Sequence, residues 1–137
     1  MADARPPLTA ELVWSGDLRF DASSGTGKAV VDGDSKAGPS PTQYAAMGLA
    51  GCMAADVVDI LRKGRHPLEA LRATFTGTRA ENPPRRFTAI ALHFDVKGAV
   101  PAEAIERAIS LSREKYCSVW HSFSQDIKLS TTFDVHS

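Results

Sequence analysis

The sequence has only two cysteines, and no apolar run in it comes close to the roughly 20 residues that cross a bilayer. It also has no excess of charge, with 16 basic and 16 acidic residues among 137 and no cluster of lysines and arginines. These absences argue against a nucleic-acid binder and against a membrane protein. Residues 1–10 are polar and contain no signal-peptide segment. We therefore expect a cytoplasmic protein whose thiols are kept reduced.

The usual catalytic motifs are also missing. No G-x-S-x-G occurs, so a serine hydrolase has no support. The Gly25–Gly27 segment matches neither the P-loop nor the dinucleotide fingerprint and is expected to be a turn. Cys117 and His121 could be two metal ligands, or a thiol and its base, but a zinc site takes about four ligands and no second pair has ligand spacing. We predict no metal and no cofactor.

The hydrophobic pattern predicts one domain over residues 1–137. Short strands flank a glycine turn at residues 12–14 and 18–20, and a third strand is expected at 28–31. Alternating residues predict strands at 68–80 and around 90–96, with a turn at 81–86, and a last strand at 127–135. A second helix begins at Pro101 and should break near Tyr116. Its apolar stripe contains Ile105, Ala108, Ile109, Ser112 and Tyr116. This order indicates an α+β fold.

A long helix is expected from about Pro41 or Thr42 to Lys63. Ser40 is a candidate N-cap, with Gln43 three residues later as in a capping box, and Gly64 is a stop signal. The helix centre, residues 45–55, is almost wholly apolar and consists of small residues. A helix that is apolar on every side is expected to be buried on every side.

The two cysteines are the candidate chemical centre, although each could also be a small core residue. Cys52 lies in the long helix, and Asp56 follows four residues later on the same helical face. An anion at that place disfavours a thiolate, so a cation should offset it. The candidate cations are Arg19, Lys28, Arg85 and Arg86. A bridge from Cys52 to Cys117, 65 positions later, could stabilise the fold by roughly 4 kcal/mol.

Several segments together resemble one known family. The run Ser-Pro-Thr-Gln-Tyr-Ala-Ala-Met-Gly-Leu-Ala-Gly-Cys at 40–52, its continuation at 56–63 and the segment 108–117 resemble the OsmC/Ohr family of thiol-dependent peroxidases. The resemblance extends from about residue 12 to residue 135. It implies an OsmC-like fold, with curved antiparallel sheets around long central helices, in an intertwined homodimer.

The resemblance also implies a chemistry. Cys52 would be the peroxidatic thiol and Cys117 the resolving thiol, and the two would form a disulfide after reduction of an organic hydroperoxide. A lipoyl or thioredoxin-like dithiol would restore the pair. The biological role would be defence against oxidative stress.

This chain departs from the family near the start of the long helix. Active members have an acidic residue there, paired with an arginine that steadies the thiolate, whereas this sequence has Thr42 and Gln43. The supporting candidates are therefore Gln43, Arg19, Lys28 and Asp56. The alternative function is an OsmC-like thiol redox or small-ligand-binding protein with little or no peroxidase turnover.

Overall fold

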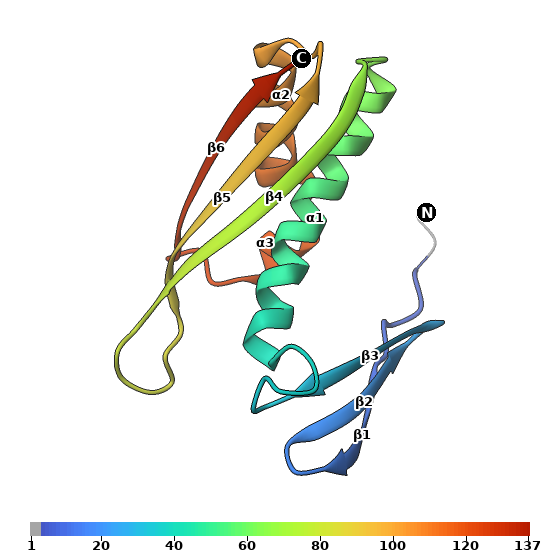
Figure 1. The fold of residues 1–137 in the computed structure, drawn as a ribbon, viewed down its shortest axis with the longest axis vertical. Coiled ribbons are helices and arrows are strands. Elements are labelled where there is room, and N and C mark those ends of the chain that lie inside the picture. The colour runs from blue at the N-terminus through green and yellow to red at the C-terminus, as the bar shows by residue number, and fades with distance from the viewer. Residues whose placement is uncertain (1–3) are drawn as a thin grey trace. The chain divides into compact units, whose positions relative to one another are not determined.

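The computed structural model describes residues 4–137. The chain divides into two compact units, of which the first ends at Ala45 and the second runs from Ala46 to Ser137. The predicted α+β class is confirmed, because each unit has a three-stranded sheet and the second unit also contains the helices (Figure 1). The single domain expected from the sequence stays a prediction.

The sheet of the first unit is antiparallel, in the order β1 (Glu11–Gly16), β2 (Arg19–Ser24), β3 (Gly27–Asp32). The predicted hairpin and third strand are confirmed. Asp17 follows Gly16 in the first turn, and both have positive φ, which is where glycine and aspartate are best tolerated.

A buried carboxylate organises the loop after β3. Asp32 is only 2% exposed and accepts hydrogen bonds from the backbone N–H groups of Asp34, Lys36 and Ala37. These bonds favour the ionised form, with that of Ala37 contributing most, and they lower the pKa of Asp32 below its ordinary value. The composition predicts this loop, but not the residue that holds it.

Helix α1 (Pro41–Lys63) begins with the predicted capping box. The Ser40 hydroxyl accepts from the Gln43 N–H at 3.2 Å, and the Gln43 side-chain oxygen accepts from the Ser40 N–H at 2.8 Å. The helix ends as expected, with the Gly64 N–H bonded to the carbonyl of Ile60.

Only one face of α1 is covered within this chain. Its buried side chains recur every fourth residue: Leu49, Met53, Val57 and Leu61. Met47 is 47% exposed, and Gly48, Gly51 and Ala55 are exposed as well. One chain thus covers one side of the helix, because the second unit has a single sheet, and burial on all sides, within a homodimer, stays a prediction.

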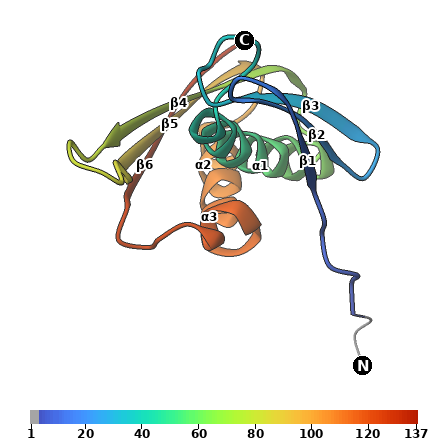
Figure 2. The ribbon, with the colours of Figure 1, turned by 90° about the horizontal axis from the view of Figure 1, so that it is seen from below.

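The second sheet has the order β4 (Leu68–Arg79), β5 (Phe87–Gly98), β6 (Lys128–His136), and the helices lie on one of its faces (Figure 2). Ile90, Leu92, Phe94 and Val96 alternate along β5 and are buried in the core against α1. The outer face of β5 carries the residues between them.

One detail of the predicted antiparallel sheets needs correction. Strand β4 pairs with β5 in an antiparallel manner, but β6 runs parallel to β5. The reason is the helical segment between them, which carries the chain back along the sheet so that β6 starts from the same end as β5.

The segment between β5 and β6 is broken as predicted. Helix α2 (Ala102–Leu111) continues into one π-helical turn, η1 (Ser112–Tyr116), and Cys117 is extended before the short helix α3 (Ser118–Ser122). The π-turn inserts extra backbone and shifts the register of the helix face. Tyr116 is consequently 52% exposed and does not continue the predicted apolar stripe, whereas Ser112 is fully buried.

Length and composition also single out α1 as a helix that could cross a membrane. Its most apolar 18-residue window has a mean hydropathy of 1.5, and 22% of that window is buried. Every 18-residue window of α1 contains Asp56, so the helix meets this criterion without an uninterrupted apolar run of that length. The core helix of a soluble protein passes the same test, so one such helix is weak evidence for a membrane span.

Candidate functional site

The second unit brings the two cysteines together. The Sγ atoms of Cys52 and Cys117 and a carboxylate oxygen of Asp56 all lie within 4.8 Å of one another. Both cysteines are free thiols. Cys52 and Asp56 come from successive turns of α1, and Cys117 comes from the segment between η1 and α3. Residues that are 65 positions apart in the sequence thus form one cluster.

Helix α1 positions the first two groups by its periodicity. Residues four apart lie one above the other on a helix, so Cys52 and Asp56 share a face. Both are partly exposed, next to the buried stripe that begins at Leu49. Cys52 is therefore partly open to solvent while its helix is held in the core.

The π-turn positions the other two groups. The Cys117 N–H donates to the carbonyl of Ser112 at 2.8 Å, and the buried Ser112 hydroxyl donates to Oδ2 of Asp56 at 2.8 Å. The Cys117 sulfur accepts from the Trp120 N–H at 3.3 Å and so caps α3. A π-turn is rare and occurs often at functional sites. Here it aims a hydroxyl and a thiol at α1.

The two thiols have different environments. Cys117 is fully buried, and burial is the main cause that raises the pKa of its thiol to about 11. The Trp120 N–H opposes this change, and the neighbouring Cys52 adds to it. At neutral pH the Cys117 thiol is held protonated and hidden from solvent. Cys52 is the thiol that a solute can reach.

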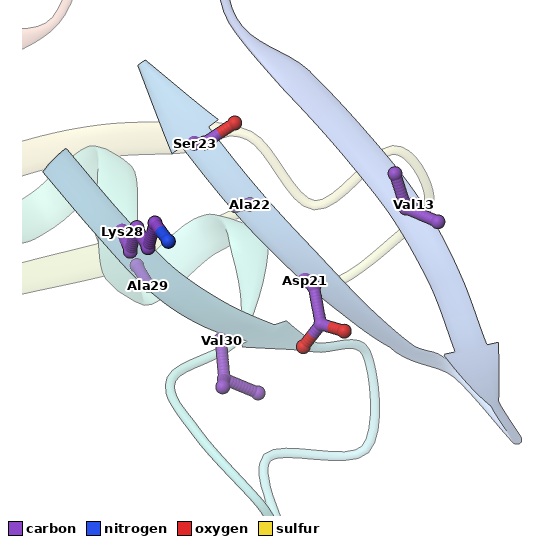
Figure 3. A pocket seen from close by; sticks show the side chains of 7 residues that line it. All are labelled: Val13, Asp21, Ala22, Ser23, Lys28, Ala29 and Val30. Atoms are coloured by element: carbon purple, nitrogen blue, oxygen red, sulfur yellow. The ribbon is translucent and has the colours of Figure 1, made fainter. Parts of the chain in front are cut away.

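Of the four supporting candidates, Asp56 belongs to this cluster. Gln43, Arg19 and Lys28 belong to the first unit. The Gln43 side-chain oxygen is occupied by the helix cap and by the Ser35 hydroxyl. Arg19 stands opposite Asp32 on the neighbouring strand and helps to lower its pKa. Figure 3 shows Lys28 beside a hollow on the sheet of the first unit, with Asp21 on the next strand.

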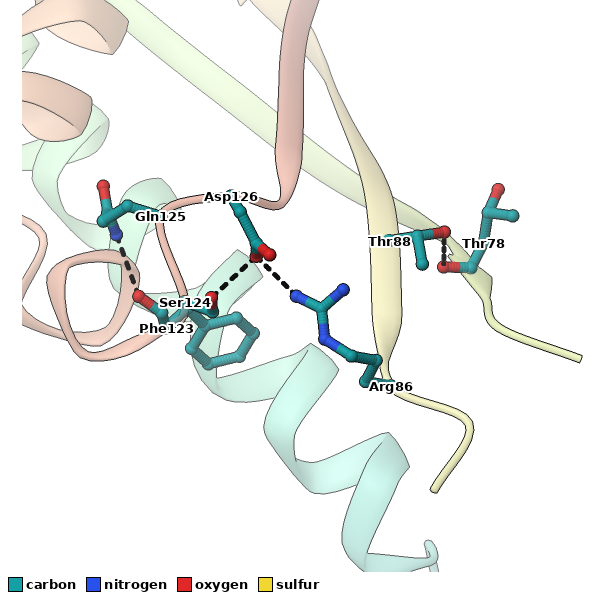
Figure 4. A network of polar contacts seen from close by, with 7 residues as sticks. All are labelled: Thr78, Arg86, Thr88, Phe123, Ser124, Gln125 and Asp126. Atoms are coloured by element: carbon teal, nitrogen blue, oxygen red, sulfur yellow. Dashed lines mark hydrogen bonds and ion pairs between the residues drawn. The ribbon is translucent and has the colours of Figure 1, made fainter. Parts of the chain in front are cut away.

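Two further cations were candidates on the turn between β4 and β5. Arg86 forms an ion pair with Asp126, which also accepts from the Ser124 hydroxyl (Figure 4). Arg85 has a positive φ, and its carbonyl accepts from the Arg79 side chain. The carboxylate of Asp56 is a charged group that the structure places within 4.8 Å of both sulfurs.

Sequence reasoning missed Ser112 as part of the site. A signal for it was present, since Ser112 was the one serine in the apolar stripe predicted for the second helix. Such a residue needs a hydrogen-bond partner when it is buried. Its partner, Asp56, lies 56 positions earlier.

The cluster offers two thiol ligands and one carboxylate ligand to a metal, and a water would have to complete a tetrahedral zinc site. His121, the other ligand considered from the sequence, is exposed on α3 and is not among these three groups. Two thiols in contact also fit thiol–disulfide chemistry, for which no metal is needed.

One protein family and several known proteins resemble this chain over most of its length. The OsmC-like protein family matches residues 32–132. The protein YhfA of Escherichia coli K12 is 37% identical over 131 residues, which are 93% of this chain and 98% of YhfA. A solved structure of a hypothetical protein from Aquifex aeolicus VF5 has a TM-score of 0.89 at 26% identity, covering 96% of this chain and 98% of that one.

A protein that is named for resistance to organic hydroperoxides has the same fold. The organic hydroperoxide resistance protein OsmC of Legionella pneumophila superposes with a TM-score of 0.71, covering 97% of this chain and all of that one. At 17% identity this likeness concerns the fold alone.

Proposed function

Because the chain belongs to the OsmC-like protein family, as the family match and the 37% identity to YhfA show, we propose that it is a thiol-dependent peroxidase that reduces organic hydroperoxides in oxidative stress defence. The observation that carries this proposal is the contact between a partly exposed thiol, Cys52, and a buried one, Cys117. Structural neighbours from Legionella pneumophila and Bacillus subtilis bear the name organic hydroperoxide resistance protein, which supports the substrate class.

In the first step, Cys52 attacks the peroxide. Its thiolate bonds to the terminal oxygen of ROOH and breaks the O–O bond, so the sulfur is oxidised to a sulfenic acid and the peroxide is reduced. The leaving alkoxide takes up a proton and departs as the alcohol ROH. Cys52 performs this step because it is the exposed thiol of the pair.

In the second step, Cys117 resolves the sulfenic acid. Its sulfur attacks the sulfur of Cys52, a disulfide forms, and the hydroxyl leaves as water with the proton of the Cys117 thiol. The sulfurs, now within 4.8 Å, must approach to about 2.05 Å. A protonated, buried resolving thiol has a benefit, since it does not compete with Cys52 for peroxide.

Asp56 is the group that we assign to proton transfer. Its carboxylate lies beside both sulfurs and is held by the Ser112 hydroxyl. An anion there does not stabilise a thiolate, but it can accept the proton that a thiol must lose. It would take the Cys117 proton during attack and pass it to the leaving hydroxyl.

The cycle needs an external reductant. A lipoyl or thioredoxin-like dithiol would attack the Cys52–Cys117 disulfide, pass through a mixed disulfide and leave oxidised, with both cysteines returned as thiols. Such reductants belong to a reducing compartment, and we place the protein in the cytoplasm on that ground.

We also propose that the working form is a homodimer. The uncovered face of α1 has small residues, and an added Cβ at Gly48 or Gly51 would meet nothing within 4 Å. A second copy of this apolar helix is the partner that fits such a face. Arg19 and Lys28 of that copy are then candidate cations for Cys52.

A variant of the exposed helix face tests the dimer. Gly51→Leu should shift the protein toward monomer in analytical ultracentrifugation, because its side chain has space in one chain but would occupy the place of a partner. Ser110→Leu, on an exposed position of α2, is the matched control and should leave the dimer intact. Two monomeric proteins, or two unchanged dimers, would contradict the proposal.

The alternative function is a thiol redox or small-ligand-binding protein with little turnover. The observation that favours it is the electrostatics of the site, where a carboxylate stands next to the reactive sulfur. The acidic residue that active family members have near the start of this helix is also replaced here, by Thr42 and Gln43, which favours slow peroxide reduction.

A peroxide assay separates the two functions. Reduced protein is mixed with cumene hydroperoxide or hydrogen peroxide, with dithiol present, and peroxide and free thiols are followed over time. A peroxidase consumes many equivalents and prefers the organic peroxide, whereas the alternative loses two thiols per chain without turnover. Cys52→Ser should abolish consumption, and Cys117→Ser should leave a sulfenic acid that dimedone traps. Unchanged thiols would overturn both the peroxidase and the thiol redox protein, and would leave the small-ligand-binding protein.

A further inference from the structure

We propose that the outer face of the second sheet carries a binding site for a divalent transition metal, Zn²⁺ in the first instance, formed by His93, Asp95 and Asp134. This cluster is separate from the thiol site, because it lies on the face of the sheet opposite the buried core residues of β5. The argument rests on strand register, on distances between ligand atoms and on the orientation of one histidine ring.

The register brings the three side chains together. His93 and Asp95 are two residues apart on β5, so they point to the same face. In the parallel pairing, Asp134 of β6 stands opposite Asp95, and Thr132 stands opposite His93. Phe94 and Phe133 form the pair between them and turn to the core face. The outer position of the cluster thus follows from the same alternation that builds the core.

The distances suit a metal ion. Nε2 of His93 lies 3.4 Å from Oδ1 of Asp95 and 3.2 Å from Oδ2 of Asp134, and the three ligand atoms all lie within 4.8 Å of one another. At Zn–N and Zn–O bonds of about 2.0–2.2 Å, tetrahedral geometry separates two ligand atoms by about 3.3–3.6 Å. The cluster supplies three corners of that tetrahedron, and water would supply the fourth.

The histidine ring is held by its other nitrogen. Nδ1 of His93 lies 2.7 Å from the Thr132 hydroxyl. When Nδ1 donates this hydrogen bond, Nε2 presents its lone pair to the space between the carboxylates, as in metal-bound histidines that are oriented by an outer partner. A single N–H on Nε2 could point to only one of the two carboxylates, whereas a cation would bind both.

The charges balance for a divalent ion. A neutral imidazole and two carboxylates carry two negative charges, which Zn²⁺ neutralises. Arg72 stands opposite Asp95 on β4, and Lys97 and His136 form the next outward-facing pair along the strands. Arg72 and Lys97 reduce the local negative potential, so we expect weaker binding than in a closed structural site.

Zinc titration of a thiol-free protein tests the site. The double variant Cys52→Ser/Cys117→Ser removes the other candidate ligand group, and isothermal titration with ZnCl₂ should then show one ion per chain. Adding His93→Ala should weaken binding at least tenfold, as should Asp134→Asn. His136→Ala is the matched control, since it removes an exposed histidine from β6, the strand that carries Asp134. It should change the zinc affinity less than twofold.

Circular dichroism of each variant checks that it is folded. The proposal fails if the double variant binds no zinc, if His93→Ala binds as tightly as its parent, or if His136→Ala weakens binding equally. Because no reactive thiol is present, these results are independent of whether the protein reduces peroxides.

Discussion

The buried thiol Cys117 should be almost unreactive when it is the only thiol. In the variant Cys52→Ser, the burial that mainly raises the pKa of Cys117 to about 11 remains, although the smaller contribution of Cys52 is lost. A thiol with a pKa of about 11 has roughly one part in ten thousand as thiolate at pH 7, against about three parts in a hundred for an ordinary cysteine. The ratio is about 300-fold, and the fully buried sulfur is also shielded from the reagent.

Alkylation by iodoacetamide measures this difference. The rate for Cys52→Ser should be at least ~100-fold below that of free cysteine at pH 7 and should rise about tenfold per pH unit up to pH 10. Cys117→Ser is the matched variant, whose only thiol is the partly exposed Cys52, and it should react much faster. In urea the two variants should react alike. A rate for Cys52→Ser that levels off near pH 8.5, or that comes within tenfold of free cysteine, would refute the reasoning.

Three further results are expected. Ser112→Ala removes the hydroxyl bond to Asp56 and should lower the free energy of unfolding by about 1.5–3 kcal/mol in urea denaturation; no change would show that water replaces the hydroxyl. Reduced wild-type protein should lose stability relative to Cys117→Ser between pH 9 and about 11, because the unfolded chain releases the thiol proton first; parallel pH curves would contradict this. Asp32→Ala should expose the peptide bond after Lys36 to trypsin, because the carboxylate that holds the loop is lost. Wild-type protein should show the same loop opening in acid, as the pH falls through the lowered pKa of Asp32, when it is digested with a protease that is active at low pH. Equal digestion rates of the variant and the wild type would mean that the carboxylate does not hold the loop.

Local signals predicted the elements well. The pair Ser40 and Gln43 gave the start of α1, and Gly64 gave its end, because capping depends on residues within one turn. Alternation gave the strands, and the break near Tyr116 was expected from helix length. What local signals could not give was the direction of β6, because strand pairing is decided by contacts between distant residues.

The site was predictable only in part. Residue patterns alone left Cys52 and Cys117 as possible core residues, and the family resemblance made them a pair. The hydrogen bond from Ser112 to Asp56 depends on a π-turn, for which the sequence has no simple signal. The apolar character of α1 showed that the helix needs cover, and the family resemblance, not the residue pattern, suggested a second chain as the cover.

The parallel pairing of β5 with β6 has a consequence for synthesis on the ribosome. The hairpin of β4 and β5 can close as soon as it leaves the exit tunnel, but β6 can add only after the whole crossover of residues 99–127 has followed it. Cys117 is carried on that crossover, and its sulfur is seated beside Cys52 when the helices dock. During translation the early cysteine is therefore an ordinary thiol on an unfinished chain. The nascent chain therefore brings its two thiols together late in synthesis, close to the time when the C-terminal strand completes the sheet.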